Sequence, residues 1–132
     1  MKNLRTGGFY ILLFSLPFCK GGGLFYPGLP EHYQKSGLIS SSTYQVTFSV
    51  LADSEEEARS RGEGEGRNRA FEMMVKEPFI GRFNYDRKRN ELQRLVSSYG
   101  RVVYVARESP GSWGVVYQVT QQGSLKKTLL DL

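Results

Sequence analysis

Residues 54–76 read SEEEARSRGEGEGRNRAFEMMVK and decide the fold of this chain of 132 residues. Ser54, with Glu57 three residues later, forms a capping box, which predicts that a helix begins here. The helix ends near residue 76, because Pro78 disfavours helical geometry in the residue before it. Small residues recur at every fourth position, namely Ala58, Gly62, Gly66 and Ala70. Residues spaced by four share one face of a helix, so this stripe predicts a helix that lies close against a sheet.

The glycines of this segment, Gly62, Gly64 and Gly66, each destabilise a helix interior by about 1 kcal/mol relative to alanine. Gly64 lies off the stripe, and no role is assigned to it. A kink, or a loop between two shorter helices, is the alternative interpretation. The three glycines do not match a dinucleotide-binding fingerprint, which requires glycine at the position of Arg67 and a strand directly before it. We therefore expect no nucleotide cofactor.

The segments on either side of this helix predict the rest of the domain. Before it, apolar residues alternate with polar ones as in a half-buried strand, at Tyr44, Val46, Phe48 and Val50. After it, residues 84–99 predict a second helix that Gly100 ends as a C-terminal cap. Residues 102–106 and 114–120 predict an antiparallel hairpin with a turn at Pro110-Gly111. Residues 124–132 form either a short helix or an edge strand.

The order of these elements is β-α-α-β-β plus a C-terminal element. It predicts an α+β fold, in which a small antiparallel sheet of about three to four strands carries two helices on one face. Residues 43–132 form this domain. A domain of about 90 residues buries enough surface to fold alone.

Residues 1–18 have the layout of an export signal peptide. Lys2 and Arg5 precede an uncharged apolar run at residues 9–18. A membrane-spanning helix needs roughly 20 apolar residues, so we expect cleavage rather than insertion. Removing residues 1–18 lowers the formal charge from +5 to +3, because two bases and no acid are lost.

The apolar run ends at Cys19, the only cysteine of the chain. The segment Leu16-Pro17-Phe18-Cys19 resembles a bacterial lipobox, in the looser form of spirochaete-type lipoproteins. The resemblance implies that Cys19 is acylated, as with palmitate, and becomes the first residue of a mature lipoprotein. It also implies a place in the cell envelope, at the outer membrane and in contact with the periplasm. The alternative is an ordinary buried thiol, because free cysteines are often buried.

Residues 19–42 predict a lipidated tether, disordered or loosely packed, because they are rich in glycine, proline and serine and lack any period. Their apolar stretch, residues 24–30, docks on the domain or on the lipid surface. The only histidine, His32, lies in this tether as a solvated residue. One histidine and one cysteine offer no metal set and no catalytic triad. We therefore expect no enzyme activity, no catalytic residue, no metal and no cofactor.

The two helices carry many arginines interleaved with glutamates. Arg87, Lys88 and Arg89 lie on the exposed side of the second helix, and Trp113 lies near the tip of the hairpin. These four residues are the candidates for ligand binding, through charge and through an aromatic anchor. The alternative for Trp113 is that it folds back and caps the sheet.

The domain pattern also carries a resemblance. It consists of the strand at 44–51, the capped helix with small residues every four, the second helix, and a hairpin that ends in Tyr117-Gln118-Val119. This pattern resembles the small α+β domain of certain bacterial surface lipoproteins and of the N-terminal region of flagellar outer-ring assembly proteins. The resemblance implies a non-catalytic domain that acts in envelope assembly or protein contact.

We therefore expect a lipid-anchored envelope protein with a protein partner in the envelope. The alternative is an exported domain that binds an anionic ligand, such as glycan, lipopolysaccharide or nucleic acid, through basic helix residues. Export argues against nucleic acid. Exposed strand edges make self-association a further expectation. An enzyme of unknown type is the third hypothesis.

Overall fold

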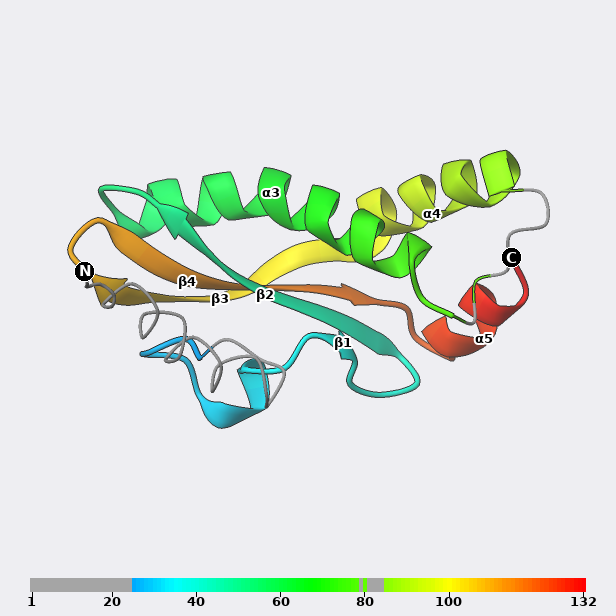
Figure 1. The fold of residues 1–132 in the computed structure, drawn as a ribbon, viewed down its shortest axis with the longest axis horizontal. Coiled ribbons are helices and arrows are strands. Elements are labelled where there is room, and N and C mark those ends of the chain that lie inside the picture. The colour runs from blue at the N-terminus through cyan, green and yellow to red at the C-terminus, as the bar shows by residue number, and fades with distance from the viewer. Residues whose placement is uncertain (1–24, 79, 81–84) are drawn as a thin grey trace, which may run out of the picture.

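A four-stranded antiparallel sheet forms the centre of the structure, a computed structural model that describes residues 25–78, 80 and 85–132. The strand order is β1-β2-β4-β3, and α3 and α4 lie over one face of the sheet (Figure 1). The α+β class and the predicted order of elements are confirmed. The elements are η1 (Glu31–Tyr33), β1 (Gly37–Leu38), β2 (Thr43–Leu51), α3 (Glu55–Val75), α4 (Tyr85–Tyr99), β3 (Gly100–Ser109), β4 (Ser112–Thr120) and α5 (Leu125–Leu130).

The long helix α3 begins at the predicted capping box. The backbone N–H of Glu57 donates to Ser54 Oγ at 3.1 Å, and Glu57 Oε1 accepts from the backbone N–H of Asp53 at 2.9 Å. The helix continues as one element to Val75, three residues before Pro78. The alternative of two shorter helices is therefore wrong.

The stripe of small residues on α3 faces the sheet. Ala58 and Ala70 are fully buried. A Cβ atom on Gly62 would lie 2.8 Å from Val115 Cγ1, and a Cβ atom on Gly66 would overlap the ring of Tyr117. The two glycines are therefore required by the close approach of helix and sheet. A Cβ atom on Gly64 would meet nothing within 4 Å, and nothing in the structure explains a glycine there.

The apolar core lies between the sheet and the helices. It includes the alternating residues of β2, from Tyr44 to Val50, and buried side chains of α4 such as Leu92 and Val96. The C-terminal segment forms α5, a helix rather than an edge strand, and it adds Leu125 and Leu129 to the core. The hydroxyl of Tyr44 donates to Glu77 Oε2 at 2.6 Å, so the one polar tip of this row has a partner.

The role assigned to Gly100 is wrong. This residue is the first of β3 rather than a helix cap, and it is not among the glycines with positive φ. A Cβ atom at this position would collide with the hydroxyl of Tyr117 and lie 2.6 Å from the carbonyl oxygen of Val96. The glycine therefore allows α4 to pass directly into a strand above a large buried ring. The hairpin turn at Pro110-Gly111 is confirmed, with Gly111 at φ 81°.

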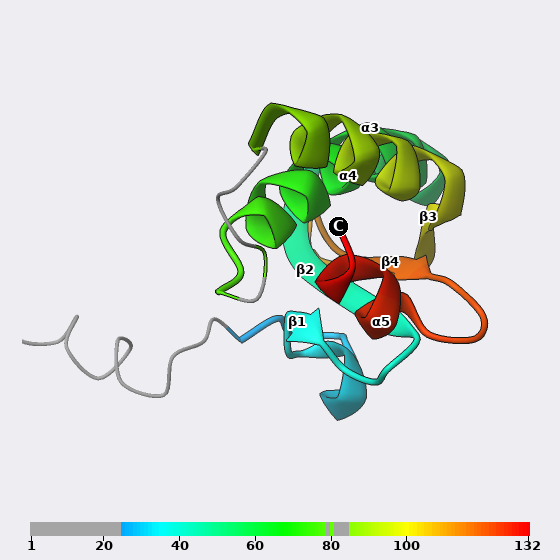
Figure 2. The same cartoon turned by 90° about the vertical axis from the view of Figure 1, so that its right-hand side faces the viewer.

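The second face of the sheet is covered by the N-terminal part of the chain, which was interpreted as part of a loose tether. Figures 1 and 2 both show this part on the side opposite α3 and α4. Leu29 is 7% exposed, and the ring of Tyr33 lies 5.1 Å from the ring of Tyr104 on β3. For residues 25–42 the tether interpretation is therefore wrong. The sequence allowed residues 24–30 to dock either on the domain or on the lipid surface. The burial of Leu29 agrees with docking on the domain.

Hydrogen bonds from the sheet explain why this part is ordered. Thr47 Oγ1 donates to the carbonyl oxygen of Tyr33 at 2.6 Å, and Gln45 Nε2 donates to that of Lys35 at 2.7 Å. Thr47 and Gln45 are buried, and buried polar groups require hydrogen-bond partners. The alternating pattern of β2 made these side chains look solvent-facing, although the N-terminal part supplies their acceptors.

The predicted signal peptide, Cys19 and the rest of residues 1–24 lie outside the described residues. Export, cleavage and acylation therefore stay predictions. Within the described part of the chain, no helix is long and apolar enough to cross a membrane.

Candidate binding groove between the two helices

A groove of about 350 Å³ runs between α3 and α4. Its apolar residues are Phe71 and Val96. Its polar residues are Arg67, Asn68, Gln93, Arg94 and Ser97, so each helix contributes one arginine. The groove therefore combines two positive charges with hydrogen-bonding amides, a hydroxyl group and a short apolar strip.

Arg67 lies near the buried Tyr117. Gly66 lets α3 approach the ring of Tyr117, and the guanidinium of Arg67 is close enough to influence the pKa of the Tyr117 hydroxyl. Burial raises the pKa of Tyr117, and the neighbouring Arg67 guanidinium works in the opposite direction. Tyr117 therefore stays protonated at neutral pH.

Most other arginines of the two helices are neutralised by glutamates one turn away. The pairs are Arg59–Glu55 at 3.6 Å, Arg61–Glu57 at 2.9 Å, Arg69–Glu65 at 2.7 Å and Arg87–Glu91 at 3.5 Å. Such exposed pairs contribute only about 0.3–0.5 kcal/mol each, but they cancel charge. Among the described residues, neither Arg67 nor Arg94 forms an ion pair of this kind, and no carboxylate lines the groove.

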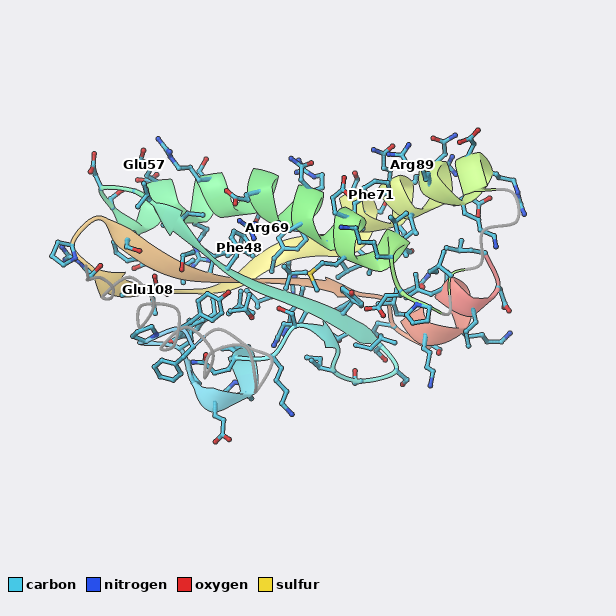
Figure 3. The ribbon with its side chains drawn as sticks, in the orientation of Figure 1. Phe48, Glu57, Arg69, Phe71, Arg89 and Glu108 are labelled. Atoms are coloured by element: carbon cyan, nitrogen blue, oxygen red, sulfur yellow. The ribbon has the colours of Figure 1, made fainter. Side chains whose placement is uncertain are left out.

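The predicted binding residues of α4 do not line this groove. Arg87 pairs with Glu91, and the guanidinium of Arg89 lies over the ring of Phe71 at 5.1 Å from its centroid (Figure 3). Lys88 is only 9% exposed, so its predicted place on the exposed side of the helix is wrong. Lys88 lies four residues before the buried Leu92, and this spacing puts both on one face. The spacing was the sequence signal that would have found its burial.

Trp113 folds back onto the domain, as the alternative interpretation held. Its indole N–H donates to the carbonyl oxygen of Ala52 at 3.1 Å, and its side chain packs partly buried against the core. The guanidinium of Arg107 lies 5.9 Å from the indole ring. The antiparallel pairing of β4 with β2 places Trp113 opposite Val50, so the indole caps the end of the sheet.

A second, larger pocket of about 770 Å³ lies on the opposite face, between the N-terminal part and the sheet. Its lining residues carry both signs of charge, with Glu31 beside His32 and Lys35. His32 is exposed, as predicted, and its ring lies 4.2 Å from that of Tyr33. In the part of the chain that the structure covers, no three His, Cys, Asp or Glu side chains are grouped to hold a metal ion.

The groove is a feature that the sequence reasoning did not single out, although both arginines belong to the basic set of the two helices. Both have a glutamate one turn before them, Glu63 before Arg67 and Glu91 before Arg94, so the sequence does not distinguish them from the paired arginines. The structure does, because Glu63 Oε2 accepts from the backbone N–H of Val102 at 3.0 Å and Glu91 lies 3.5 Å from Arg87. No family model, no curated protein and no solved structure matches this chain. The resemblances to lipoproteins and to ring-assembly proteins therefore stay predictions.

Proposed function

We propose that this protein is a lipid-anchored, non-catalytic binding domain of the cell envelope, whose α3–α4 groove binds an acidic segment of a protein partner. The observation that carries this proposal is the groove itself. Arg67 and Arg94 line it with no carboxylate among the lining residues, whereas neighbouring arginines are paired with glutamates. Charged hydrogen bonds from a guanidinium favour a carboxylate, which can accept two of them in parallel.

The lining favours a protein segment over a long polyanion. A polyanion is held by an extended run of lysine and arginine side chains that have no acidic partner, each of which neutralises one charge of the polymer. On α3 that run is interrupted, because Arg59, Arg61 and Arg69 already face glutamates. The groove is short, and it places Phe71 and Val96 beside the arginines. Apolar and charged groups side by side are typical of contacts between proteins.

The anchor rests on the sequence. The apolar run before Cys19 and the lipobox-like Leu16 motif support export and acylation. The docked N-terminal part is consistent with this, because it leads the chain from the anchor to the domain on the face away from the groove (Figure 1).

The groove is tested with a fluorescent hexaglutamate peptide, whose binding is followed by anisotropy at low and moderate salt. We expect Arg67→Ala and Arg94→Ala each to weaken binding about tenfold, because a charged hydrogen bond contributes about 1.5 kcal/mol. Arg101→Ala is the matched control. Arg101 pairs with Gln118 across the strands and therefore lies on the opposite face from the groove.

Two results would contradict the groove as the binding site. One is an absence of peptide binding, and the other is an equal loss of binding in the Arg101→Ala control. The second candidate function, binding of an anionic polymer, would replace the first if heparin or single-stranded DNA bound more tightly than the peptide. That binding would have to depend on the same two arginines and fall steeply with salt.

The anchor is tested by expressing the full chain in a bacterial host and measuring its intact mass. We expect a chain that begins at Cys19, heavier by its acyl groups, and that enters the detergent phase. The Cys19→Ser variant should lose both properties. An uncleaved, water-soluble wild-type chain would contradict the proposed lipid anchor. The groove would still be tested separately by peptide binding.

A further inference from the structure

We propose that the domain is held directly against the bilayer, with its N-terminal part facing the lipid headgroups and its two helices facing away. The proposal rests on the lipid anchor of the proposed function and adds to it an orientation and a distance. We define the docked segment as residues 26–38, which lie on the sheet face opposite α3 and α4.

The distance follows from how much of the predicted tether the fold takes up. A free tether of residues 19–42 would reach about 80 Å when fully extended, at roughly 3.5 Å per residue. In the structure the chain is already part of the fold at Tyr26. Only residues 19–24 separate the anchor from Phe25, the first described residue, and they span at most about 20 Å. This reach is comparable with the size of the domain itself, so the domain stays at the membrane surface.

The first residues of the docked segment are held by several contacts. The side-chain amide of Gln34 accepts from the backbone N–H of Tyr26 at 2.9 Å and donates to its carbonyl oxygen at 2.8 Å. The same amide donates to the carbonyl oxygen of Leu29 at 2.9 Å. Gly28 adopts φ 91°, where a Cβ atom would lie 3.0 Å from the carbonyl oxygen of Arg107. The segment therefore begins at a defined point beneath β3 and β4.

The docked segment and the residues at its two ends suit a lipid headgroup layer. Phe25 is 75% exposed at the end of the tether, and Ile39 is 44% exposed just beyond the docked segment. Aromatic and apolar side chains of this kind are common at membrane interfaces. Between residues 25 and 42 the only formal charges are those of Glu31 and Lys35, which cancel. The helices on the other face carry a dense set of charged side chains, which favour water (Figure 3).

The orientation has a consequence for the binding groove. Because α3 and α4 lie on the opposite side of the sheet from the docked segment, the groove opens away from the anchoring bilayer. An acidic partner segment therefore reaches Arg67 and Arg94 from the aqueous side. The partner must itself come within a domain's thickness of the membrane surface.

The test uses the acylated full chain in vesicles of phosphatidylethanolamine and phosphatidylglycerol that contain a headgroup-labelled acceptor lipid. Two single-cysteine labels are compared: Glu31→Cys on the docked segment and Ser60→Cys on α3, both at exposed positions. Lipid on the sulfur of Cys19 leaves each variant with one reactive thiol. We expect several-fold more efficient energy transfer to the lipid from position 31 than from position 60.

A lengthened tether provides the matched control. Inserting about 18 Gly/Ser residues between Gly23 and Leu24 restores the reach of a free tether, so the difference between the two labels should disappear. A Phe25→Ser variant should reduce the transfer from position 31 without changing the anchor.

The outcomes separate the inference from the function on which it rests. Acylated protein that shows equal transfer from both positions would overturn the orientation and leave the anchor in place. A difference that survives the lengthened tether would overturn the short tether as the cause of the orientation, because tether length would then play no part. Protein whose intact mass shows no acyl group would overturn the anchor and this inference together.

Discussion

The two faces of the sheet are buried in different ways. On the helix face, side chains of β3 and β4 lie so close to α3 that a single added carbon atom would clash, and glycine is required at Gly62 and Gly66. On the second face, Gln45 and Thr47 are buried by hydrogen bonds to backbone carbonyls of the docked segment. The difference teaches that burial does not require an apolar pattern, provided that each polar group finds a partner.

The largest effect is expected on the helix face. Gly66→Leu forces a side chain into the ring of Tyr117, and overpacking of this kind costs about 3 kcal/mol or more. We expect the urea unfolding midpoint to fall sharply or the domain not to fold. Gly64→Leu is the matched control, because a Cβ atom at Gly64 meets nothing within 4 Å. Equal loss in both variants would contradict the close approach at Gly66 as the cause, because leucine favours a helix more than glycine does.

The second face is tested by Gln45→Leu. The carbonyl oxygens of His32 and Lys35 would lose their donor, at a cost of about 1–3 kcal/mol for buried unpaired groups. We expect faster trypsin cleavage after Lys35, because the docked segment is released before the domain unfolds. Gln118→Leu removes only the contact to Gln45 Oε1 and should have the smaller effect. Unchanged cleavage after Lys35 would show that these hydrogen bonds do not hold the segment.

A smaller effect is expected from the hydroxyl group of Tyr44, which lies on the helix face of the sheet. Burial, and then the hydrogen bond to Glu77, raise the pKa of Tyr44 far above its usual value of 10.0. Because this folded-state pKa lies above the unfolded one, the contribution of Tyr44 to stability is full below pH 10 and falls as the pH rises further. Tyr44→Phe should cost about 1 kcal/mol at neutral pH, through loss of one hydrogen bond.

The urea unfolding midpoint is measured at a series of pH values, from neutral pH to above pH 10. The wild-type midpoint should fall more steeply there than that of Tyr44→Phe, so the two curves converge. Parallel curves would assign the alkaline loss to other groups, such as Tyr117, whose pKa burial also raises.

The smallest effect is expected at Gly64, which packs against neither face of the sheet. Gly64→Ala should stabilise the domain by up to about 1 kcal/mol, because alanine favours the helix and the position is open. Thermal unfolding would show a higher midpoint. A lower midpoint would indicate that Gly64 has a role that the packing does not reveal.

Several elements were predictable because their signals are local. The alternation from Tyr44 to Val50 predicted β2, and the capping box at Ser54 and Glu57 predicted the start of α3 to within a residue. The spacing of the small residues predicted the packing of α3 on the sheet. In each case the deciding hydrogen bonds or side-chain periods connect residues at most four positions apart.

The binding groove was less predictable, because it depends on which charges meet. Arg67 and Arg94 come from different helices and share a groove only after α3 and α4 pack on the sheet. The candidates drawn from the sequence were chosen for local charge, and the structure pairs or buries Arg87 and Lys88. Local composition says nothing about which side of a helix meets a neighbour until the core is in place.

The sequence by itself determined the α+β class, the order of the elements and the closeness of α3 to the sheet, because periodicity and capping are properties of neighbouring residues. Only the tertiary structure decided that residues 26–38 are part of the fold and that Gly100 is required by Tyr117. It also decided that two arginines lack glutamate partners. These features join residues far apart in the chain, and their energies appear only when the sheet brings the segments together.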